Sequence, residues 1–377
     1  MGIGRFGGDL RKVAVAALVL FAAAAVCFAS GVELWKPDGK LRFLSEDELA
    51  YHPNDDEWYS ESWNLNYIDH DGLYFVLCIA ISNIGIGDEK ANALFIASTP
   101  DGRRRYARTD YYQPPQLVAA TDRWYLEFPS TRVIKGKDGV RVRFEWKGIL
   151  LEASYEPKVR PLTLGSGFTF FSRNSYFSEF VQIPASTVKG KLVIDGRTYR
   201  LSGYGFADHQ RTNTMMNRIY DYYASFFGYT RTAAVHFFES ATHDGRKPAV
   251  QMIYATDKGR VVFSAPAYEF KIVKKKVDAN RGFVMPLEIE FSAQSGGRRI
   301  FGRIKNRRLL DELDLKSQLK PFERVLASLI SEFFVYRWTS EVTWTVEGAD
   351  FKETYKGRAA EFEIGYYRKP QLPPDEY

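Results

Sequence analysis

The sequence predicts an all-β protein made of two antiparallel β-barrels in tandem, and three features indicate this fold. Asp-Gly pairs, which favour the positive φ angles of hairpin turns, recur along the chain. They occur at Asp38-Gly39, Asp71-Gly72, Asp101-Gly102, Asp138-Gly139, Asp195-Gly196 and Asp244-Gly245. Apolar and polar residues alternate beside several of these pairs, as in strands with one buried face. Aromatic residues make up 15% of the 377 residues, which suits sheet interiors or a ligand cavity.

The clearest strands flank the Asp-Gly pairs. From Val140 to Lys147 every even-numbered residue is apolar and every odd-numbered residue is charged. This alternation predicts a strand with one buried face and one solvent-exposed face. Residues 191–194 and 197–201 predict a hairpin around Asp195-Gly196. Residues 341–364 predict two or three closing strands, interrupted at glycines.

One segment departs from the β pattern. After Pro321, apolar residues recur at helical spacing up to Phe333, which predicts an amphipathic helix of about three turns late in the second barrel. We interpret it as a helix that packs on a barrel mouth or a sheet; the alternative is a helix on a membrane surface. A second helical stretch is predicted within residues 212–223.

Prolines and glycines interrupt the alternation between residues 155 and 175. We therefore expect an N-terminal barrel over residues 30–165 and a C-terminal barrel over residues 166–367. Residues 368–377 contain three prolines and predict a flexible tail.

The first 29 residues have the composition of a secretory signal. Basic residues up to Lys12 precede an uncharged apolar run from Val13 to Phe28, and Ala29 supplies a small residue for cleavage. We expect cleavage near Ala29 and a periplasmic or secreted protein. The alternative is an uncleaved inner-membrane anchor, because about 17 apolar residues are at the lower limit for a span.

After such cleavage Cys78 is the one remaining cysteine, so the fold must be held by its core and not by an internal disulfide. The formal net charge of +6 is modest and does not indicate nucleic acid as a partner. The basic segments 103–105 and 274–276 are interpreted as solvated loops, with contact to anionic lipid headgroups as the alternative.

Several enzyme signatures are missing from the sequence. It has no Gly-x-Ser-x-Gly elbow, no phosphate-binding loop and no dinucleotide fingerprint. Five histidines lack the spacings that bring two of them onto one metal ion. We expect no cofactor and no metal, since a metal site would need assembly over long range.

The most unusual string is residues 203–210, Gly-Tyr-Gly-Phe-Ala-Asp-His-Gln. Two glycines allow a close backbone approach, and Asp208 and His209 are candidates for a proton donor and acceptor in an apolar cavity, with Tyr204 as a partner. Desolvation there would raise the pKa of the carboxyl group. The alternative is that both side chains merely hydrogen-bond the following loop.

Aromatic residues near these positions and near the start of the first barrel predict the wall of a ligand cavity. In residues 57–63, for example, carboxylates alternate with aromatics. The predicted ligand-binding residues are Trp58, Trp63, Tyr74, Trp146, Tyr204, Phe206, Asp208 and His209.

Three groups of short strings carry a family resemblance. Residues 61–63, 72–74 and 81–85 resemble the opening of the fungal survival-factor proteins, which are tandem lipocalin-like proteins linked to oxidative-stress survival and sphingolipid handling. Residues 321–327 and 334–338 are similar to the segment of that family that joins a helix to its closing strands. Residues 203–209 resemble the wider clan that includes carotenoid hydratase and AttH-like secreted lipocalins. The chain departs from these relatives in its export signal and in Arg211-Thr212-Asn213, where hydratase-like members often carry Asn-Trp pairs.

The resemblance implies two lipocalin-like barrels and an exported carrier that holds an apolar lipid, either sphingolipid-like or isoprenoid. Its partners would be that lipid and, transiently, a membrane surface or a membrane transporter. The alternative is an enzyme, a hydratase, cyclase or isomerase, that acts on a polyene or prenyl lipid with Asp208 as proton donor. A third hypothesis is a non-catalytic module of a cell-envelope complex.

Overall fold

The structure, a computed structural model, describes residues 39–83, 90–108, 112, 116–242, 248–314 and 333–367. The described chain is all-β. Its strands form two antiparallel sheets, and its helical content is limited to short 3₁₀ turns such as Asp47–Leu49 and Met216–Arg218. The all-β, antiparallel part of the predicted fold class is therefore confirmed.

The first sheet has the strand order β5-β4-β3-β2-β14-β13-β10-β9-β8-β7-β6, and the short strands β1, β11 and β12 extend it beside β13. Its strands are β1 (Leu41–Phe43), β2 (Ser60–Ile68), β3 (Tyr74–Ser82), β4 (Lys90–Ser98), β5 (Arg104–Arg108), β6 (Val118–Ala119), β7 (Tyr125–Phe128), β8 (Thr131–Gly136), β9 (Gly139–Trp146), β10 (Ile149–Pro157), β11 (Leu162–Leu164), β12 (Phe168–Ser172), β13 (Ser175–Ile194) and β14 (Arg197–Thr212).

The second sheet has the order β18-β17-β16-β15-β24-β22-β21-β20-β19, with β23 paired to β22. Its strands are β15 (Tyr220–Tyr229), β16 (Ala233–Thr242), β17 (Pro248–Asp257), β18 (Arg260–Ala265), β19 (Glu269–Val277), β20 (Val284–Ser295), β21 (Arg298–Asp314), β22 (Phe334–Glu347), β23 (Lys352–Gly357) and β24 (Ala359–Tyr366).

Each sheet curls around its own hydrophobic core. The first core includes Trp63, Phe95 and Phe144, and the second includes Phe237 and Trp344. Among the described strands, no pairing joins β5 to β6 or β18 to β19, so each sheet is a half-barrel and not the closed barrel expected from the sequence.

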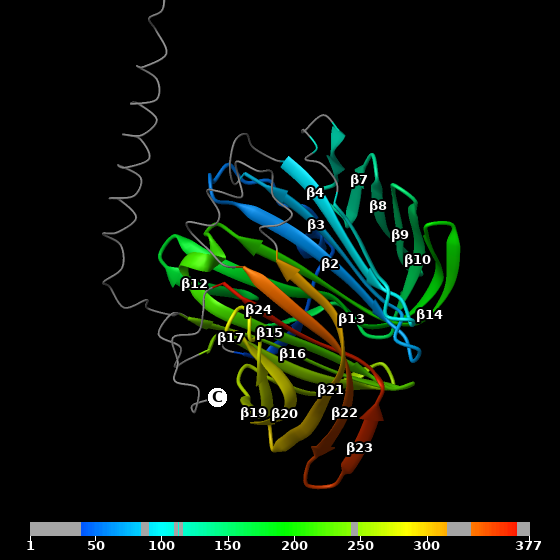
Figure 1. Ribbon diagram of the computed structural model, residues 1–377. Coiled ribbons are helices and arrows are strands. Elements are labelled where there is room, and N and C mark those ends of the chain that lie inside the picture. The colour runs from blue at the N-terminus through cyan, green and yellow to red at the C-terminus, as the bar shows by residue number, and fades with distance from the viewer. Residues whose placement is uncertain are drawn as a thin grey trace, which may run out of the picture.

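The outer faces of the two sheets meet (Figure 1), and a third apolar cluster contains residues of both sheets. Phe206 of β14 packs on Phe227 of β15 with ring centroids 4.2 Å apart, and Tyr204 stacks on Tyr229 at 5.3 Å. Arg308 of β21 donates hydrogen bonds to backbone carbonyls of two turns of the first sheet. The two sheets are therefore packed against each other and are not independent domains joined by a linker.

The change of sheet lies between Thr212, the end of β14, and Tyr220, the start of β15. This is later than the division expected at residues 165 and 166. The prolines and glycines near that point accompany the short strands β11 and β12, which pair with β13 of the same sheet.

The helix predicted within residues 212–223 is wrong, because β14 and β15 occupy both ends of that segment around one 3₁₀ turn. The helix predicted from Pro321 to Phe333 lies outside the described residues except for Phe333. The predicted flexible tail, 368–377, and the predicted signal, 1–29, lie outside them entirely.

The predicted turn chemistry is confirmed at the β13–β14 hairpin. Asp195 and Gly196 have φ angles of 50° and 78°. Two positive φ angles are what a two-residue type I′ turn requires, and glycine adopts them without strain.

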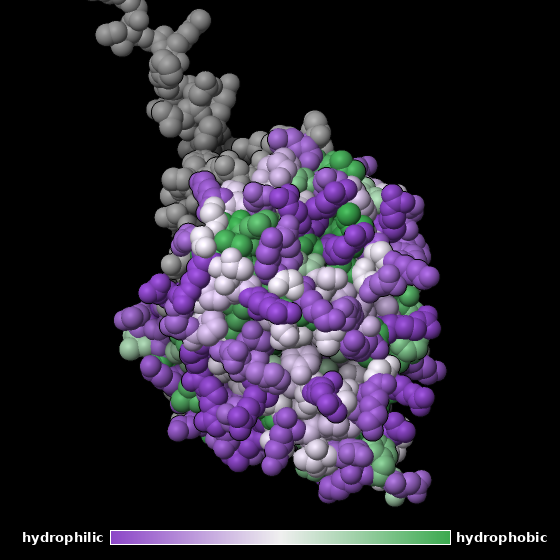
Figure 2. Space-filling view, turned by 90° about the vertical axis from the view of Figure 1, so that its right-hand side faces the viewer, coloured by the Kyte–Doolittle hydropathy of each residue, from purple (hydrophilic) through white to green (hydrophobic). Residues whose placement is uncertain are grey.

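The surface is mainly polar. Figure 2 shows one face on which hydrophilic side chains surround small hydrophobic patches. Within the described ranges, no helix combines the length and apolar character needed to cross a bilayer.

Candidate functional site

Alternation along β2 and β14 sends neighbouring side chains to opposite sides of the first sheet. Asn64 and Asp208, which are directly paired across these strands, face the second sheet. Trp63 and His209, which form the adjacent pair, belong to the interior of the first sheet. Two distinct sites therefore arise from the same two strands.

The first site is a pocket of about 280 Å³ between the sheets. Its walls are largely apolar, and they come from both sheets: Val76, Cys78, Leu94, Ile96, Phe177, Phe227, Phe238 and Val335. Polar groups converge on it from β2, β14, β15, β22 and β24: Asn64, Asp208, Tyr223, Arg337 and Glu363. An apolar cavity with a few placed polar groups is the usual form of a small-molecule site.

Asp208 is the pocket carboxyl group with the clearest capacity for proton transfer. Its side chain is buried, and Asn64 Nδ2 donates a hydrogen bond to its Oδ1 at 2.7 Å. Burial raises the pKa of Asp208 to about 7, the Asn64 hydrogen bond lowers it, and the charge of Glu363 adds to the rise. Near neutral pH both protonation states are therefore populated, as a general acid or base requires.

Arg337 supplies the positive charge of the pocket. Its Nη1 donates to Asp311 at 2.9 Å and its Nε to Glu363, which also accepts a hydrogen bond from Tyr223. Burial lowers the pKa of this guanidinium, but the carboxylates around it, Glu363 first, raise it well above its usual value. Arg337 thus stays charged and fixes the position of Glu363.

Glu361 lies deeper, at the contact between the sheets. Tyr74 donates its hydroxyl to Glu361 at 2.7 Å, and Asn66 Nδ2 donates at 3.1 Å. Burial and the charge of Glu363 raise the pKa of Glu361 to about 7, against the effect of Arg337. This carboxyl group links β24 to β2 and β3 across the contact between the sheets.

The residues predicted from sequence are divided among several places. Asp208 lines the pocket, and Phe206 packs on the pocket residue Phe227. Tyr74 lies outside the pocket lining and donates its hydroxyl to Glu361. Tyr204 faces the same layer but is outside the pocket lining; its hydroxyl lies 3.4 Å from Nε2 of His70.

The other predicted residues lie away from the pocket. His209 and Trp63 stack on each other inside the first sheet, with ring centroids 4.8 Å apart. Trp58 is half-buried in the turn before β2. Trp146 ends β9, where the amine of Lys147 lies 4.6 Å from its ring. The structure therefore does not bring Asp208 and His209 together as a donor–acceptor pair.

Sequence reasoning missed Arg337, Glu363 and Tyr223. No clear signal was present in the local sequence, because β22 and β24 carry several polar residues besides Arg337 and Glu363. On a strand with one polar face such a residue is usually exposed, and only the packing of a second sheet on that face buries it.

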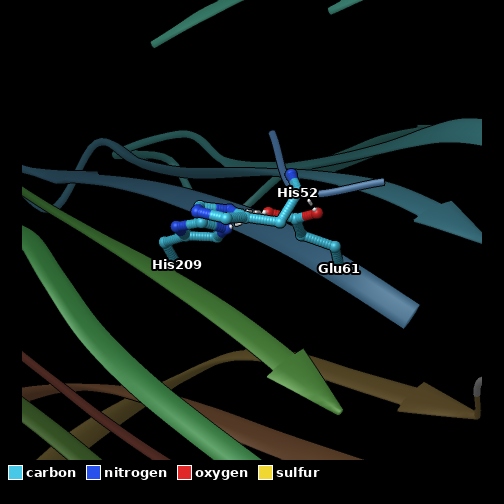
Figure 3. A group of neighbouring side chains, drawn as sticks. All are labelled: His52, Glu61 and His209. Atoms are coloured by element: carbon cyan, nitrogen blue, oxygen red, sulfur yellow. Dashed lines mark hydrogen bonds and ion pairs between the residues drawn. The ribbon is translucent and has the colours of Figure 1, made fainter. Parts of the chain in front are cut away.

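His209 belongs to the second site, on the inner face of the first sheet. His52, Glu61 and His209 are the group of described residues that lie close enough to share one metal ion, with their ligand atoms within 4.8 Å of one another (Figure 3). The two histidines are 157 positions apart in number, so this is an assembly over long range that local spacing does not reveal.

Comparison with known proteins identifies the fold. No family model matches the sequence, and no curated protein matches it. Among solved structures, a protein of Nitrosomonas europaea described as an AttH has a TM-score of 0.61 at 15% identity, over 89% of this chain and 100% of that chain. CghA, in a structure with Sch210972, has a TM-score of 0.58 at 11% identity, over 90% and 99%. Kievitone hydratase of Nectria haematococca has 0.52 at 12% identity, over 89% and 98%. The chain has the tandem lipocalin-like fold of these proteins, which confirms the AttH-like and hydratase-like part of the resemblance for the fold.

Proposed function

Starting from this fold, we propose that the chain is an exported enzyme that moves a proton on a small, largely apolar organic molecule held between the two sheets. The reaction class is the addition or elimination of water, or an isomerisation. The proposal rests on the position and the pKa of Asp208. Its buried carboxyl group has a pKa of about 7 and lines a largely apolar pocket.

The pocket favours a compact molecule with one polar end. Its volume of about 280 Å³ lies at the lower limit of common small-molecule sites, which begin near ~300 Å³. Apolar side chains of both sheets would surround the carbon skeleton. Asn64, Tyr223 and Arg337 stand where a hydroxyl or carbonyl oxygen would find hydrogen bonds.

Two carboxyl groups with different partners suit acid–base chemistry. Among the described residues, Asp208 accepts a side-chain hydrogen bond from Asn64 alone, whereas Glu363 accepts from both Arg337 and Tyr223. In an elimination, protonated Asp208 would give its proton to the departing hydroxyl, which leaves as water. Glu363 would take the proton from the neighbouring carbon as the double bond forms. Pairs of carboxyl groups in unlike environments divide the acid and base roles in this way.

The relatives of like fold support this reading. One of them is a hydratase by name, and CghA has been crystallised with a small molecule. The lipid carrier predicted from sequence would use the same pocket without changing its ligand, and it stays a prediction. The export signal lies outside the described residues, so the periplasmic or secreted location is likewise a proposal.

Proton transfer can be measured without knowing the natural substrate. The purified protein is incubated in heavy water with polyene, prenyl and phenolic compounds and with an extract of its own cells, and mass spectrometry records deuterium uptake and the gain or loss of water. We expect turnover with the native chain and a loss of about 10²–10⁴-fold in Asp208→Asn, the usual contribution of a general acid. Asp138→Asn, on an exposed turn, is the matched control and should keep full activity.

Two results would oppose the proposal. Recovery of a stoichiometric, chemically unchanged lipid from the native protein, with no deuterium in it, would establish the carrier. Absence of both turnover and any bound molecule would favour the structural module.

A further inference from the structure

The group formed by His52, Glu61 and His209 lies on the side of β2 and β14 opposite Asp208. Glu61 belongs to β2 and His209 to β14, and His52 lies in the segment that leads from the 3₁₀ turn Asp47–Leu49 into β2. Figure 3 shows the two imidazole rings lying one over the other, with the Glu61 carboxylate beside them. Glu61 and His209 are fully buried, and the His52 side chain is 32% exposed.

The Glu61 carboxylate is oriented by hydrogen bonds to one of its oxygens. Oε2 accepts from the backbone N–H of His52 at 3.0 Å and from the Tyr59 hydroxyl at 2.8 Å. The other oxygen, Oε1, therefore faces the two imidazoles. It lies 2.6 Å from His209 Nε2 and 3.2 Å from His52 Nδ1.

His209 is oriented in the same manner. Its Nδ1 lies 3.2 Å from the carbonyl oxygen of Glu48, which can only accept, so Nδ1 carries the hydrogen. Trp63 stacks on the ring and fixes its plane. In the neutral tautomer, Nε2 then presents a lone pair to the Glu61 carboxylate. Two lone pairs at this distance repel unless a proton or a metal ion lies between them.

We propose that this group binds one divalent transition-metal ion, with Zn²⁺ as the principal candidate, through His52 Nδ1, His209 Nε2 and Glu61 Oε1. Two imidazoles and one carboxylate are ligands that Zn²⁺ commonly takes. Zn–N and Zn–O bonds of ~2.0–2.2 Å at the tetrahedral angle place ligand atoms about 3.3–3.6 Å apart. The His52–Glu61 distance of 3.2 Å is already close to this value, and the Glu61–His209 distance of 2.6 Å would have to open by about 0.7–1 Å. The exposed side of His52 offers an entry path and a position for water.

The surrounding hydrogen bonds fit a metal site better than they fit a simple hydrogen-bonded triad. Metal-bound histidines usually donate their other ring N–H to a carbonyl or carboxylate, as His209 does to Glu48. Ligating carboxylates are themselves hydrogen-bonded, as Glu61 is by Tyr59. The group thus has oriented ligands together with the outer contacts that orient them.

The ion would have a structural role. It would link the segment before β2, through His52, to His209 of β14, and so stabilise the position of that segment on the first sheet. Because it lies on the other face of these strands from Asp208, its removal should lower stability without changing the protonation chemistry of the pocket. The inference is independent of the proposed function.

The test uses the full protein purified with a tag that contains no histidine. Metal content is measured by mass spectrometry after growth with Zn²⁺, and Co²⁺ is titrated into metal-stripped protein because its visible spectrum reports its ligands. We expect one equivalent of Zn²⁺ per chain, a Co²⁺ spectrum of nitrogen and oxygen ligands, and a thermal midpoint that rises with Zn²⁺. In His52→Gln the affinity should fall at least about ten-fold.

His70→Gln is the matched control, because His70 is exposed and outside the group. It should bind as the native chain does. Circular dichroism shows whether His52→Gln still folds, and the Co²⁺ spectrum of the native protein tests the site without any variant. A native protein that retains no Zn²⁺ and gives no Co²⁺ spectrum would overturn the proposal and leave a proton between Glu61 and His209. Undiminished binding by folded His52→Gln would also overturn it.

Discussion

Asp208 and His209 are consecutive in the chain, yet their hydrogen bonds lie on opposite faces of β14. Asp208 accepts from Asn64 in the pocket between the sheets at 2.7 Å, and His209 Nε2 lies 2.6 Å from Glu61 inside the first sheet. Side chains that alternate along a strand cannot share a proton across it. The two residues therefore act separately, one in the proposed proton transfer and the other in the proposed metal site.

Glu361→Gln should change how stability depends on pH. The pKa of Glu361 is about 7 in the folded chain and about 4.3 in unfolded chains. Between these values the folded state holds a proton that the unfolded state has lost, so the stability of the native chain falls as the pH rises from about 4 to about 7. The ionisable groups that act on the pKa of Glu361 are Glu363, Arg337 and Tyr74. The pKa of Asp208 is also raised, so its ionisation likewise lowers the stability of the folded chain as the pH rises.

In Glu361→Gln the fall in stability between about pH 4 and about pH 7 should be smaller by on the order of 3 kcal/mol. Urea unfolding at a series of pH values measures the free energy of unfolding. Glu353→Gln, on the exposed face of β23, should follow the native curve. A Glu361→Gln profile parallel to the native one would show that Glu361 is ionised throughout.

Arg337→Met should destabilise the chain by about 3–5 kcal/mol, because it leaves Asp311 and Glu363 buried without their cation. The matched control is Arg307→Met. Arg307 pairs with Glu341 at 2.6 Å on the surface, where its loss should cost about 0–1 kcal/mol. Equal effects of the two substitutions in thermal or urea unfolding would contradict the burial of the Arg337 cluster.

Gly205→Ala should destabilise the first sheet by about 1–3 kcal/mol through overpacking. A Cβ at this position would lie 2.5 Å from Cε1 of Tyr155 and 2.6 Å from Cγ2 of Val188. At Gly136 the nearest atom would be 3.8 Å away, so Gly136→Ala should stay within about 0.5 kcal/mol of the native chain. Urea midpoints of the two variants check this, and a neutral Gly205→Ala would mean that the Tyr155 ring can move aside.

Export should remove the first 29 residues. Basic residues, an apolar run and Ala29 form the predicted signal, so N-terminal sequencing of the protein from its own cells should begin at or near Ser30. Recovery of an intact Met1 in the membrane fraction would instead establish an anchor.

The sequence by itself determined the fold class and many local turns. Period-2 alternation in residues 140–146 specifies β9, and Asp195-Gly196 specifies a type I′ hairpin, because both signals depend only on neighbouring residues. The string at residues 203–210 also predicted that Asp208 lies in an apolar cavity, and Asp208 does line the pocket.

Only the tertiary structure decided which polar residues are buried together. Arg337 and Glu363 look like members of polar faces until β22 and β24 pack against the first sheet and remove them from water. The pairing of β2 with β14 brings Glu61 to His209, and the chain before β2 folds back to place His52 beside them. Neither contact produces a recognisable spacing of residues in the sequence. The chemistry of both sites arises between elements distant in sequence, because desolvation and charge pairing act through space and not along the chain.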